Sequence, residues 1–320
     1  MMGDTNSGRA FVFPGQGSQA VGMGKDLADT YPVARAVFQE VDDALGESLS
    51  TLMWEGPEDR LTLTANAQPA LMAVSLAVAR VLEAQSGRRF DELCDYVAGH
   101  SLGEYSALAA AGTFDVATTA RLLRLRGEAM QKAVPVGEGA MAALIGVELE
   151  AAQSLAAEAA EGEICDIAND NGGGQIVLSG HAAAIDRAVA LASKYGIKRA
   201  LKLTVSAPFH CALMAPAADA MAEALASADP RPPVVPVVAN VSAAPTSDPD
   251  VIRRQLVEQV TGRVRWRESV ASFAGLGIRS VAELGSGKVL SGLVRRIDKE
   301  LEAVAVNGPA DVDAFLASLG

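Results

Sequence analysis

The sequence predicts an α/β protein in which helices cover a buried sheet, with a smaller β-α-β-β-α-β unit inserted in the chain. Half of the 320 residues are hydrophobic but only 4% are aromatic, so Ala, Val and Leu supply most of the core. Short apolar runs also alternate with longer ones along the chain. Such a composition and order favour helices packed on a sheet. The length fits one large domain or two unequal ones.

The first part of the chain alternates between buried strands and helices. Its patterns predict, in order, strand 10–13, buried helix 70–85, strand 94–99, helix 103–112 and amphipathic helix 116–134. Pro14 ends the first strand and Pro135 follows the last helix, as expected of a residue that lacks a backbone N–H. The segment 70–85 has few polar positions, which predicts burial on all sides.

In the segment from 139 to 203 the predicted strands and helices follow one another at shorter intervals. This segment predicts strand 139–147, helix 148–162, strand 165–170, strand 175–180, helix 181–196 and strand 197–203. This β-α-β-β-α-β order is the signature of a ferredoxin-like unit. We therefore expect a small domain over 135–205, inserted in a large domain formed by 1–134 and 206–320. Two further buried strands are predicted in the large domain, at 234–241 and 278–284.

Charge and composition exclude several classes of function. The net charge is −12 and the isoelectric point is near 4.8, which argues against a nucleic-acid binder because such a protein needs a basic face. No dinucleotide fingerprint is present, so we expect no cofactor. The three cysteines, Cys94, Cys165 and Cys211, have neither zinc-ligand nor disulfide spacing. We expect no metal site and inert thiols in a reducing cytosol.

The expected location is the cytoplasm, without membrane contact. The N-terminal "MMGDTNSGRA" is polar and lacks the apolar stretch of a signal peptide. No run is expected to reach the roughly 18 apolar residues of a membrane span.

Ser101 stands in "GHSLG", a G-x-S-x-G pattern between a predicted strand and a predicted helix. That context is typical of a nucleophilic serine on a tight turn, where Gly99 and Gly103 let the helix pack closely. The helix N-terminus adds positive potential where an oxyanion forms. Alternatively, the pattern marks a structural turn only.

A serine hydroxyl needs a base within hydrogen-bond distance. His100 neighbours Ser101, so its side chain is expected to point elsewhere, and His181 opens a helix, where it would cap or face solvent. His210, in the loop "TVSAPFHCALM", remains as the base. No acidic residue lies on an obvious strand-end loop between Ser101 and His210, so a backbone carbonyl is expected to orient the histidine.

Arg126 lies among leucines in "LLRLRGEAM", whereas Arg121 and Arg124 can share a solvated face. A guanidinium on a partly buried face needs an anionic partner. That partner is either an internal Asp or Glu or the carboxylate of a substrate, which arginine can hold through two parallel hydrogen bonds.

Several motifs occur together and in order: "FVFPGQGSQAVGMG", "AGHSLGEYSALAAAG", "LRGEAMQKAVPVGEGAMAALIG", "VSAPFHCALMAPAAD", "ANV" and "ELGSGKVLSGLVRRI". Through them the chain, from about residue 10 to about residue 300, closely resembles the malonyl-CoA:acyl carrier protein transacylases of bacterial type II fatty acid synthesis. The resemblance implies an α/β-hydrolase-like large domain and a ferredoxin-like small domain. It also implies a monomer whose partners are malonyl-CoA and acyl carrier protein.

The resemblance implies a role for each matching residue. Ser101 would accept the malonyl group and pass it to the phosphopantetheine thiol of the carrier protein. His210 would be the base and Arg126 would pair with the malonyl carboxylate. The backbone N–H groups of Gln16 and Leu102 would form the oxyanion hole. The backbone carbonyl of Gln259 would orient His210. Asn169 and Asn171 would line the cleft.

Phe209 departs from many bacterial members, which have a small polar residue before the histidine. The "FH" pair resembles that of malonyl-selective acyltransferase domains in polyketide synthases. A ring beside the α-carbon of the acyl group would crowd a methyl branch, so we expect Phe209 to favour malonyl over methylmalonyl.

Two other functions compete with acyl transfer. A serine esterase or thioesterase would need an acid partner for its histidine and would not need Arg126. A non-catalytic scaffold of the same fold is disfavoured because Ser101, His210 and Arg126 are all intact. Docking of an acidic carrier protein on this acidic chain would need local cations, and three segments supply them: 194–202, 263–267 and 288–296.

Overall fold

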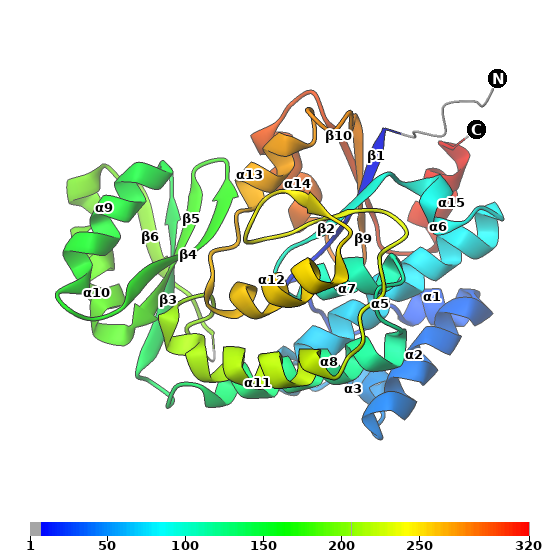
Figure 1. Cartoon of the computed structure of the whole chain (residues 1–320), viewed down its shortest axis with the longest axis horizontal. Coiled ribbons are helices and arrows are strands. Elements are labelled where there is room, and N and C mark those ends of the chain that lie inside the picture. Colours follow the sequence, from blue (N-terminus) through cyan, green and yellow to red (C-terminus); the bar gives the residue numbers. More distant parts are fainter. Residues whose placement is uncertain (1–7, 206, 320) are drawn as a thin grey trace.

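A computed structural model describes residues 8–205 and 207–319 of the chain. It has a mixed α/β architecture with two separate sheets, one at each side of the molecule in Figure 1. Residues 1–7, Ser206 and Gly320 lie outside the described residues. The outer limits of the predicted large-domain segments, and the boundary at residue 206, fall on these positions.

The larger sheet carries the strands around the predicted serine turn. Its order is β10-β9-β1-β2-β7-β8, and all pairs are parallel except β7 with β8. The strands are β1 (Arg9–Phe13), β2 (Tyr96–Gly99), β7 (Val237–Val238), β8 (Pro245–Thr246), β9 (Ser280–Leu284) and β10 (Glu302–Val306).

β1 lies in the interior of this sheet and is buried on both faces. Phe11 and Phe13 point into one apolar cluster, and Ala10 and Val12 point into another. This alternation follows from the two-residue period of a strand. A parallel sheet with both faces covered is expected to have nearly continuous apolar strands, as β1 does.

Helices cover both faces of this sheet. They are α1 (Lys25–Thr30), α2 (Pro32–Leu45), α3 (Leu49–Glu55), α4 (Glu58–Thr62), α5 (Thr64–Ser86), α6 (Phe90–Leu93), α7 (Leu102–Ala110), α8 (Val116–Lys132), α11 (Ala215–Ala226), α12 (Pro249–Thr261), α13 (Trp266–Ser272), α14 (Val289–Ile297) and α15 (Pro309–Ala317).

α5 is the central core helix. By length and composition alone it could cross a membrane, contrary to the expectation that no segment qualifies. However, 83% of its most apolar window is buried inside the fold, in contact with α2, α7 and α8. Its apolar character is thus explained by packing on all sides. The helix begins at Thr64, six residues before the predicted start, and includes Pro69.

The smaller sheet has the predicted β-α-β-β-α-β order. Its elements are β3 (Gly139–Ile145), α9 (Leu149–Ala160), β4 (Cys165–Gly172), β5 (Gln175–His181), α10 (Ala182–Leu191), the 3-10 turn η1 (Ala192–Tyr195) and β6 (Arg199–Lys202). The strands are ordered β4-β5-β3-β6 and every pair is antiparallel. α9 and α10 pack together on one face.

The predicted strand 234–241 was too long. Only Val237 and Val238 form β7, because Pro236 cannot donate to a ladder and Asn240 leaves the strand to bond the serine turn. The sequence patterns did not predict β8, β10, α1–α4, α6, α14 or α15.

β4 joins the small sheet to the connection between α12 and α13, where Val264 packs in the apolar cluster on one face of the large sheet. Asp170 N donates to Val264 O at 3.0 Å, and Val264 N donates to Ala168 O at 2.8 Å. Arg267, on α13, forms an ion pair with the buried Asp170 at 2.8 Å. The face of β4 is therefore held at a fixed place beside the carboxyl ends of β1 and β2.

Candidate active site

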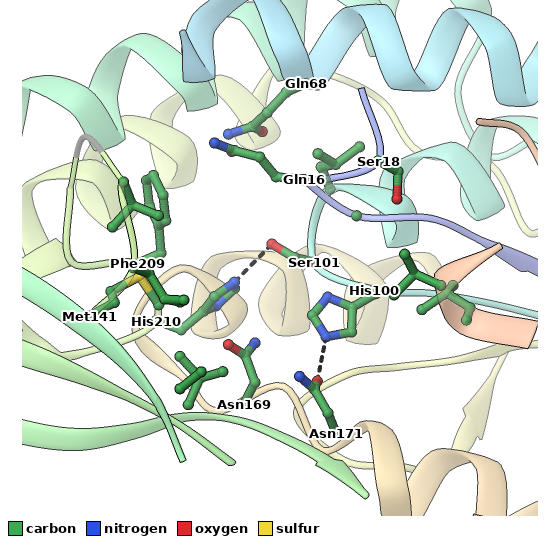
Figure 2. A pocket seen from close by; sticks show the side chains of 18 of the residues that line it. Gln16, Ser18, Gln68, His100, Ser101, Met141, Asn169, Asn171, Phe209 and His210 are labelled. Atoms are coloured by element: carbon green, nitrogen blue, oxygen red, sulfur yellow. Dashed lines mark hydrogen bonds between the residues drawn. The ribbon is translucent and has the colours of Figure 1, made fainter. Parts of the chain in front are cut away.

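Ser101 lies between β2 and α7, as the G-x-S-x-G pattern predicted. Its backbone has φ 54° and ψ −112°, a conformation that residues other than glycine rarely adopt. The turn projects the side chain into a cavity of about 280 Å³ that lies between the two sheets. Figure 2 shows Ser101 directed at His210 across this cavity.

The glycines of the motif are required by close contact. A Cβ on Gly99 would lie 1.9 Å from the carbonyl of Gly103, and one on Gly103 would lie 2.2 Å from Phe13 O. Only glycine lets α7 begin this close to β1 and β2. The strained turn is therefore sterically locked to the sheet.

His210 is the histidine that reaches the serine. Its Nε2 lies 2.8 Å from Ser101 Oγ, and its Nδ1 lies 2.8 Å from the backbone oxygen of Gln259. A carbonyl can only accept, so Nδ1 carries the proton and Nε2 is free to accept one. The carbonyl is available because Gln259 stands in the last turn of α12, where helix carbonyls lack intrahelical partners.

The charge state of His210 suits a base. Burial, and then the positive charge of Arg126, lower the pKa of His210 to about 3. The free site therefore holds a neutral imidazole at neutral pH. The other histidines are placed elsewhere: His100 Nε2 lies 2.8 Å from Asn171 Oδ1. His181 Nδ1 accepts from Ile164 N and makes no cap hydrogen bond, so the predicted capping role was wrong.

Arg126 is almost completely buried, with 1% of its surface exposed. Its guanidinium donates to Gln68 Oε1 and Gln259 Oε1, both at 2.8 Å, and to Ser101 Oγ at 3.1 Å. The ring of Tyr105 lies 5.6 Å away. Among the described residues no carboxylate forms an ion pair with Arg126. The internal salt bridge left open by the sequence is thus missing, and the cavity holds a buried cation with only neutral direct partners.

Gln16 and Leu102 come together because β1 and β2 are parallel neighbours, with Phe13 opposite Gly99. Parallel strands end at the same edge, so the loop after β1 lies beside the first residue of α7. The Leu102 N–H is at the helix start and has no intrahelical acceptor. The side chain of Gln16 bonds Thr64 Oγ1 at 3.1 Å, which fixes the loop.

The remaining predicted residues also line the cavity. Asn169 and Asn171 come from β4, at the face that the bonds to Val264 hold in place. Phe209 packs with Met141 on the wall next to His210, as Figure 2 shows. No group of three or more potential metal ligands occurs among the described residues.

Three buried side chains at the site were missed by the sequence reasoning. Asn240 Oδ1 accepts from Ser101 N at 2.8 Å and its Nδ2 donates to Gly99 O at 2.6 Å. Glu104 Oε2 accepts from Asn240 N and from Gln259 Nε2. Gln68 holds Arg126. The available signal was a polar residue inside an apolar helix, since Gln68 and Glu104 both break such runs.

Comparison with known proteins decides the family. The acyl transferase domain family matches residues 10–307. The malonyl CoA-acyl carrier protein transacylase of Escherichia coli strain K12 is 47% identical over 307 residues, which cover 96% of this chain and 98% of that protein. The chain belongs to the malonyl-CoA:acyl carrier protein transacylase family.

Solved structures of transacylases agree. The acyl-carrier-protein S-malonyltransferase of Bartonella henselae has a TM-score of 0.95 and 58% identity, covering 98% of this chain and 99% of that one. A malonyl-transacylase solved with its type II polyketide synthase acyl carrier protein has a TM-score of 0.93 and 44% identity, covering 97% and 99%.

The first prediction concerns Glu104. Burial raises the pKa of its carboxyl to about 7, although hydrogen bonds from Asn240 and Gln259 and the charge of Arg126 oppose this. The folded state therefore binds this proton more tightly than the unfolded state. Its contribution to stability is present below pH 4.5 and is lost as pH rises to 7.

We expect Glu104→Gln to gain stability over the wild type across that pH window, by up to about 3 kcal/mol. Denaturant unfolding at pH 4.5 and pH 8 measures the difference. A constant difference at the two pH values would contradict the raised pKa.

Proposed function

We propose that this chain transfers a malonyl group from malonyl-CoA to the phosphopantetheine thiol of an acyl carrier protein, through an ester on Ser101. The observation that carries the proposal is a nearly fully buried arginine, without a carboxylate partner among the described residues, whose guanidinium donates to the serine that the histidine activates. A hydrolase of neutral esters has no use for this cation, whereas a malonyl carboxylate supplies its missing charge.

The first half-reaction follows from the geometry. Ser101 Oγ attacks the thioester carbonyl carbon while His210 Nε2 takes its proton. The backbone N–H groups of Gln16 and Leu102 stabilise the oxyanion. When the C–S bond breaks, His210 returns the proton to the sulfur of coenzyme A. The malonyl group remains as an ester on Ser101, with its carboxylate on Arg126.

The second half-reaction runs the same steps in reverse. The carrier thiol gives its proton to His210 and its sulfur attacks the ester carbonyl. The new tetrahedral oxyanion occupies the same two N–H groups. As the C–O bond breaks, the proton passes to Ser101 Oγ. The chain is thus regenerated without any cofactor in the scheme.

Four cations remain for docking the acidic carrier protein or the phosphates of coenzyme A. Of the segments singled out earlier, Lys194, Lys202, Arg263, Arg265 and Arg267 are all in ion pairs. By contrast, Lys198, Arg199, Lys288, Arg295 and Arg296 form no ion pair with described residues. Arg295 donates to the backbone oxygen of Ala303, which leaves the other four. Arg296 lies against Gly173 in the β4–β5 turn, and Lys198 lies against Gly146, which neighbours Gly174 of the same turn. This turn leads into the cavity wall at Gln175.

We also propose two domains. The large sheet with its serine turn would form an α/β-hydrolase-like domain over 1–134 and 206–320. The antiparallel order β4-β5-β3-β6 supports a ferredoxin-like domain over 135–205. A cytoplasmic monomer remains the expectation.

The direct test looks for the ester. Mixing the protein with malonyl-CoA and quenching in acid should give a malonyl adduct on Ser101 by intact mass spectrometry. Holo-carrier protein should remove this adduct, and more slowly as salt rises because docking is electrostatic. Ser101→Ala should show no adduct. Loss of the adduct in plain buffer at the same rate as with carrier protein would instead support a hydrolase.

The second prediction tests Arg126. Arg126→Ala should lower kcat/KM for malonyl transfer by a factor corresponding to roughly 2–5 kcal/mol, while acetyl transfer is retained or improved. Arg124→Ala is the matched control, because Arg124 lies on the same helix but bonds Asn66 outside the cavity. Steady-state kinetics with both acyl-CoA substrates measure the ratio. Equal losses for malonyl and acetyl would count against the carboxylate clamp.

The third prediction tests Phe209. Phe209→Ser should raise methylmalonyl transfer relative to malonyl transfer by roughly 10- to 200-fold, since the ring no longer crowds the branch. Phe209→Leu keeps most of the bulk and should change the ratio less. Competition between the two CoA substrates gives the ratio of specificity constants. An unchanged ratio in both variants would exclude the assignment.

A further inference from the structure

Glu104 is a buried carboxylate with no assigned task. It stands in the first turn of α7, two positions after Leu102, with 2% of its surface exposed. No cation among the described residues forms an ion pair with it. Burying a carboxyl group costs several kcal/mol unless hydrogen bonds compensate. The hydrogen bonds of Glu104 must therefore offset the cost of its burial.

Both hydrogen bonds of Glu104 converge on one oxygen. Oε2 accepts from the backbone N–H of Asn240 at 3.0 Å and from the side-chain amide of Gln259 at 2.8 Å. Oε1 makes no hydrogen bond with the described residues. A proton can therefore reside on Oε1 while Oε2 continues to accept, so the contact with Gln259 does not require the charged form.

The side-chain amide of Gln259 is oriented with its oxygen toward Arg126. Its Nε2 donates to Glu104 Oε2 and, at 3.0 Å, to Ser101 O, while its Oε1 accepts from Arg126 at 2.8 Å. The two ends of an amide are nearly equal in size, so hydrogen bonds alone decide which way it faces. If it rotated by half a turn, an NH₂ group would face the guanidinium, and two donors would meet.

We propose that Glu104 is a positioning residue that fixes the amide of Gln259 with its oxygen toward Arg126, and so holds the guanidinium in place for a malonyl carboxylate. Oε2 of Glu104 accepts a hydrogen bond and, together with the backbone oxygen of Ser101, opposes the reversed orientation of the amide. This inference rests on the proposed function and adds a residue that touches neither substrate nor His210.

Different atoms of Gln259 contact Arg126 and His210. Its backbone oxygen, not its side chain, holds His210. Loss of Glu104 leaves the bond from the amide to Ser101 O and the backbone bond to His210 in place. It should therefore weaken the binding of a carboxylate and leave the serine–histidine pair able to transfer an uncharged acyl group. A merely structural role for Glu104 would lower transfer of both groups alike.

The test compares malonyl and acetyl transfer in three variants. Glu104→Ala removes the shortest of the hydrogen bonds that the amide nitrogen of Gln259 donates, and should lower the malonyl-to-acetyl ratio of kcat/KM by about 10- to 100-fold. Glu104→Gln retains an oxygen acceptor and should stay within about threefold of the wild type. Asp42→Ala loses two hydrogen bonds from Ser50, far from the cavity, and should lower stability but leave the ratio unchanged.

A double-mutant cycle shows whether Glu104 acts through Gln259. Gln259→Ala, with its backbone carbonyl intact, should lower the malonyl-to-acetyl ratio as Glu104→Ala does, besides any equal loss for both acyl groups from the missing bond to Ser101 O. The ratio in the double variant should fall no further than in Gln259→Ala. Additive losses would overturn the proposal, as would an unchanged ratio in Gln259→Ala. The latter measurement remains decisive even if Glu104→Ala does not fold.

The outcomes also separate this inference from the proposed function. Absence of a malonyl adduct on Ser101 in the wild type would overturn the transacylase assignment itself. A normal adduct with equal malonyl and acetyl losses in Glu104→Ala would overturn only the role of Glu104.

Discussion

The site depends on the strained backbone conformation of Ser101, which the surrounding contacts must stabilise. Ser101 stands at positive φ, and nothing intrinsic to a serine favours it there. Asn240 binds its N–H, the amide of Gln259 binds its carbonyl, and the glycine contacts press α7 against β1. The apolar sheet supplies the rigidity on which these bonds act. His210, also at positive φ, meets the serine only because both turns are fixed.

The electrostatics of the cavity follow from what surrounds Arg126. Amide oxygens solvate the guanidinium without neutralising it, and its charge helps to keep His210 neutral. An arriving carboxylate would shield that charge from the imidazole. In the proposed reaction, recognition of the acyl group and the neutral state of His210 would therefore both depend on Arg126, although Arg126 and His210 come from distant parts of the chain.

The sequence predicted the parts that local patterns encode. Periodicity gave β1, β2, α8 and the order of the small sheet, and the G-x-S-x-G context gave the serine turn. The resemblance supplied the Gln259 carbonyl, whose contact with His210 no local pattern signals. Glu104 and Asn240 were missed because their roles arise only when α7, β7 and α12 meet. The two-residue β7 was overestimated, since apolar composition alone does not reveal where a backbone turns away.

The last turn of α12 has a geometric consequence. Gln259 contacts His210 through its backbone oxygen, and it contacts Ser101 and Arg126 through the two ends of its side-chain amide. If α12 shifts as a body, all three contacts are displaced in the same direction. The displacements of these three contacts are therefore correlated. The distances among Ser101, His210 and Arg126 change less than they would if three separate elements held these residues.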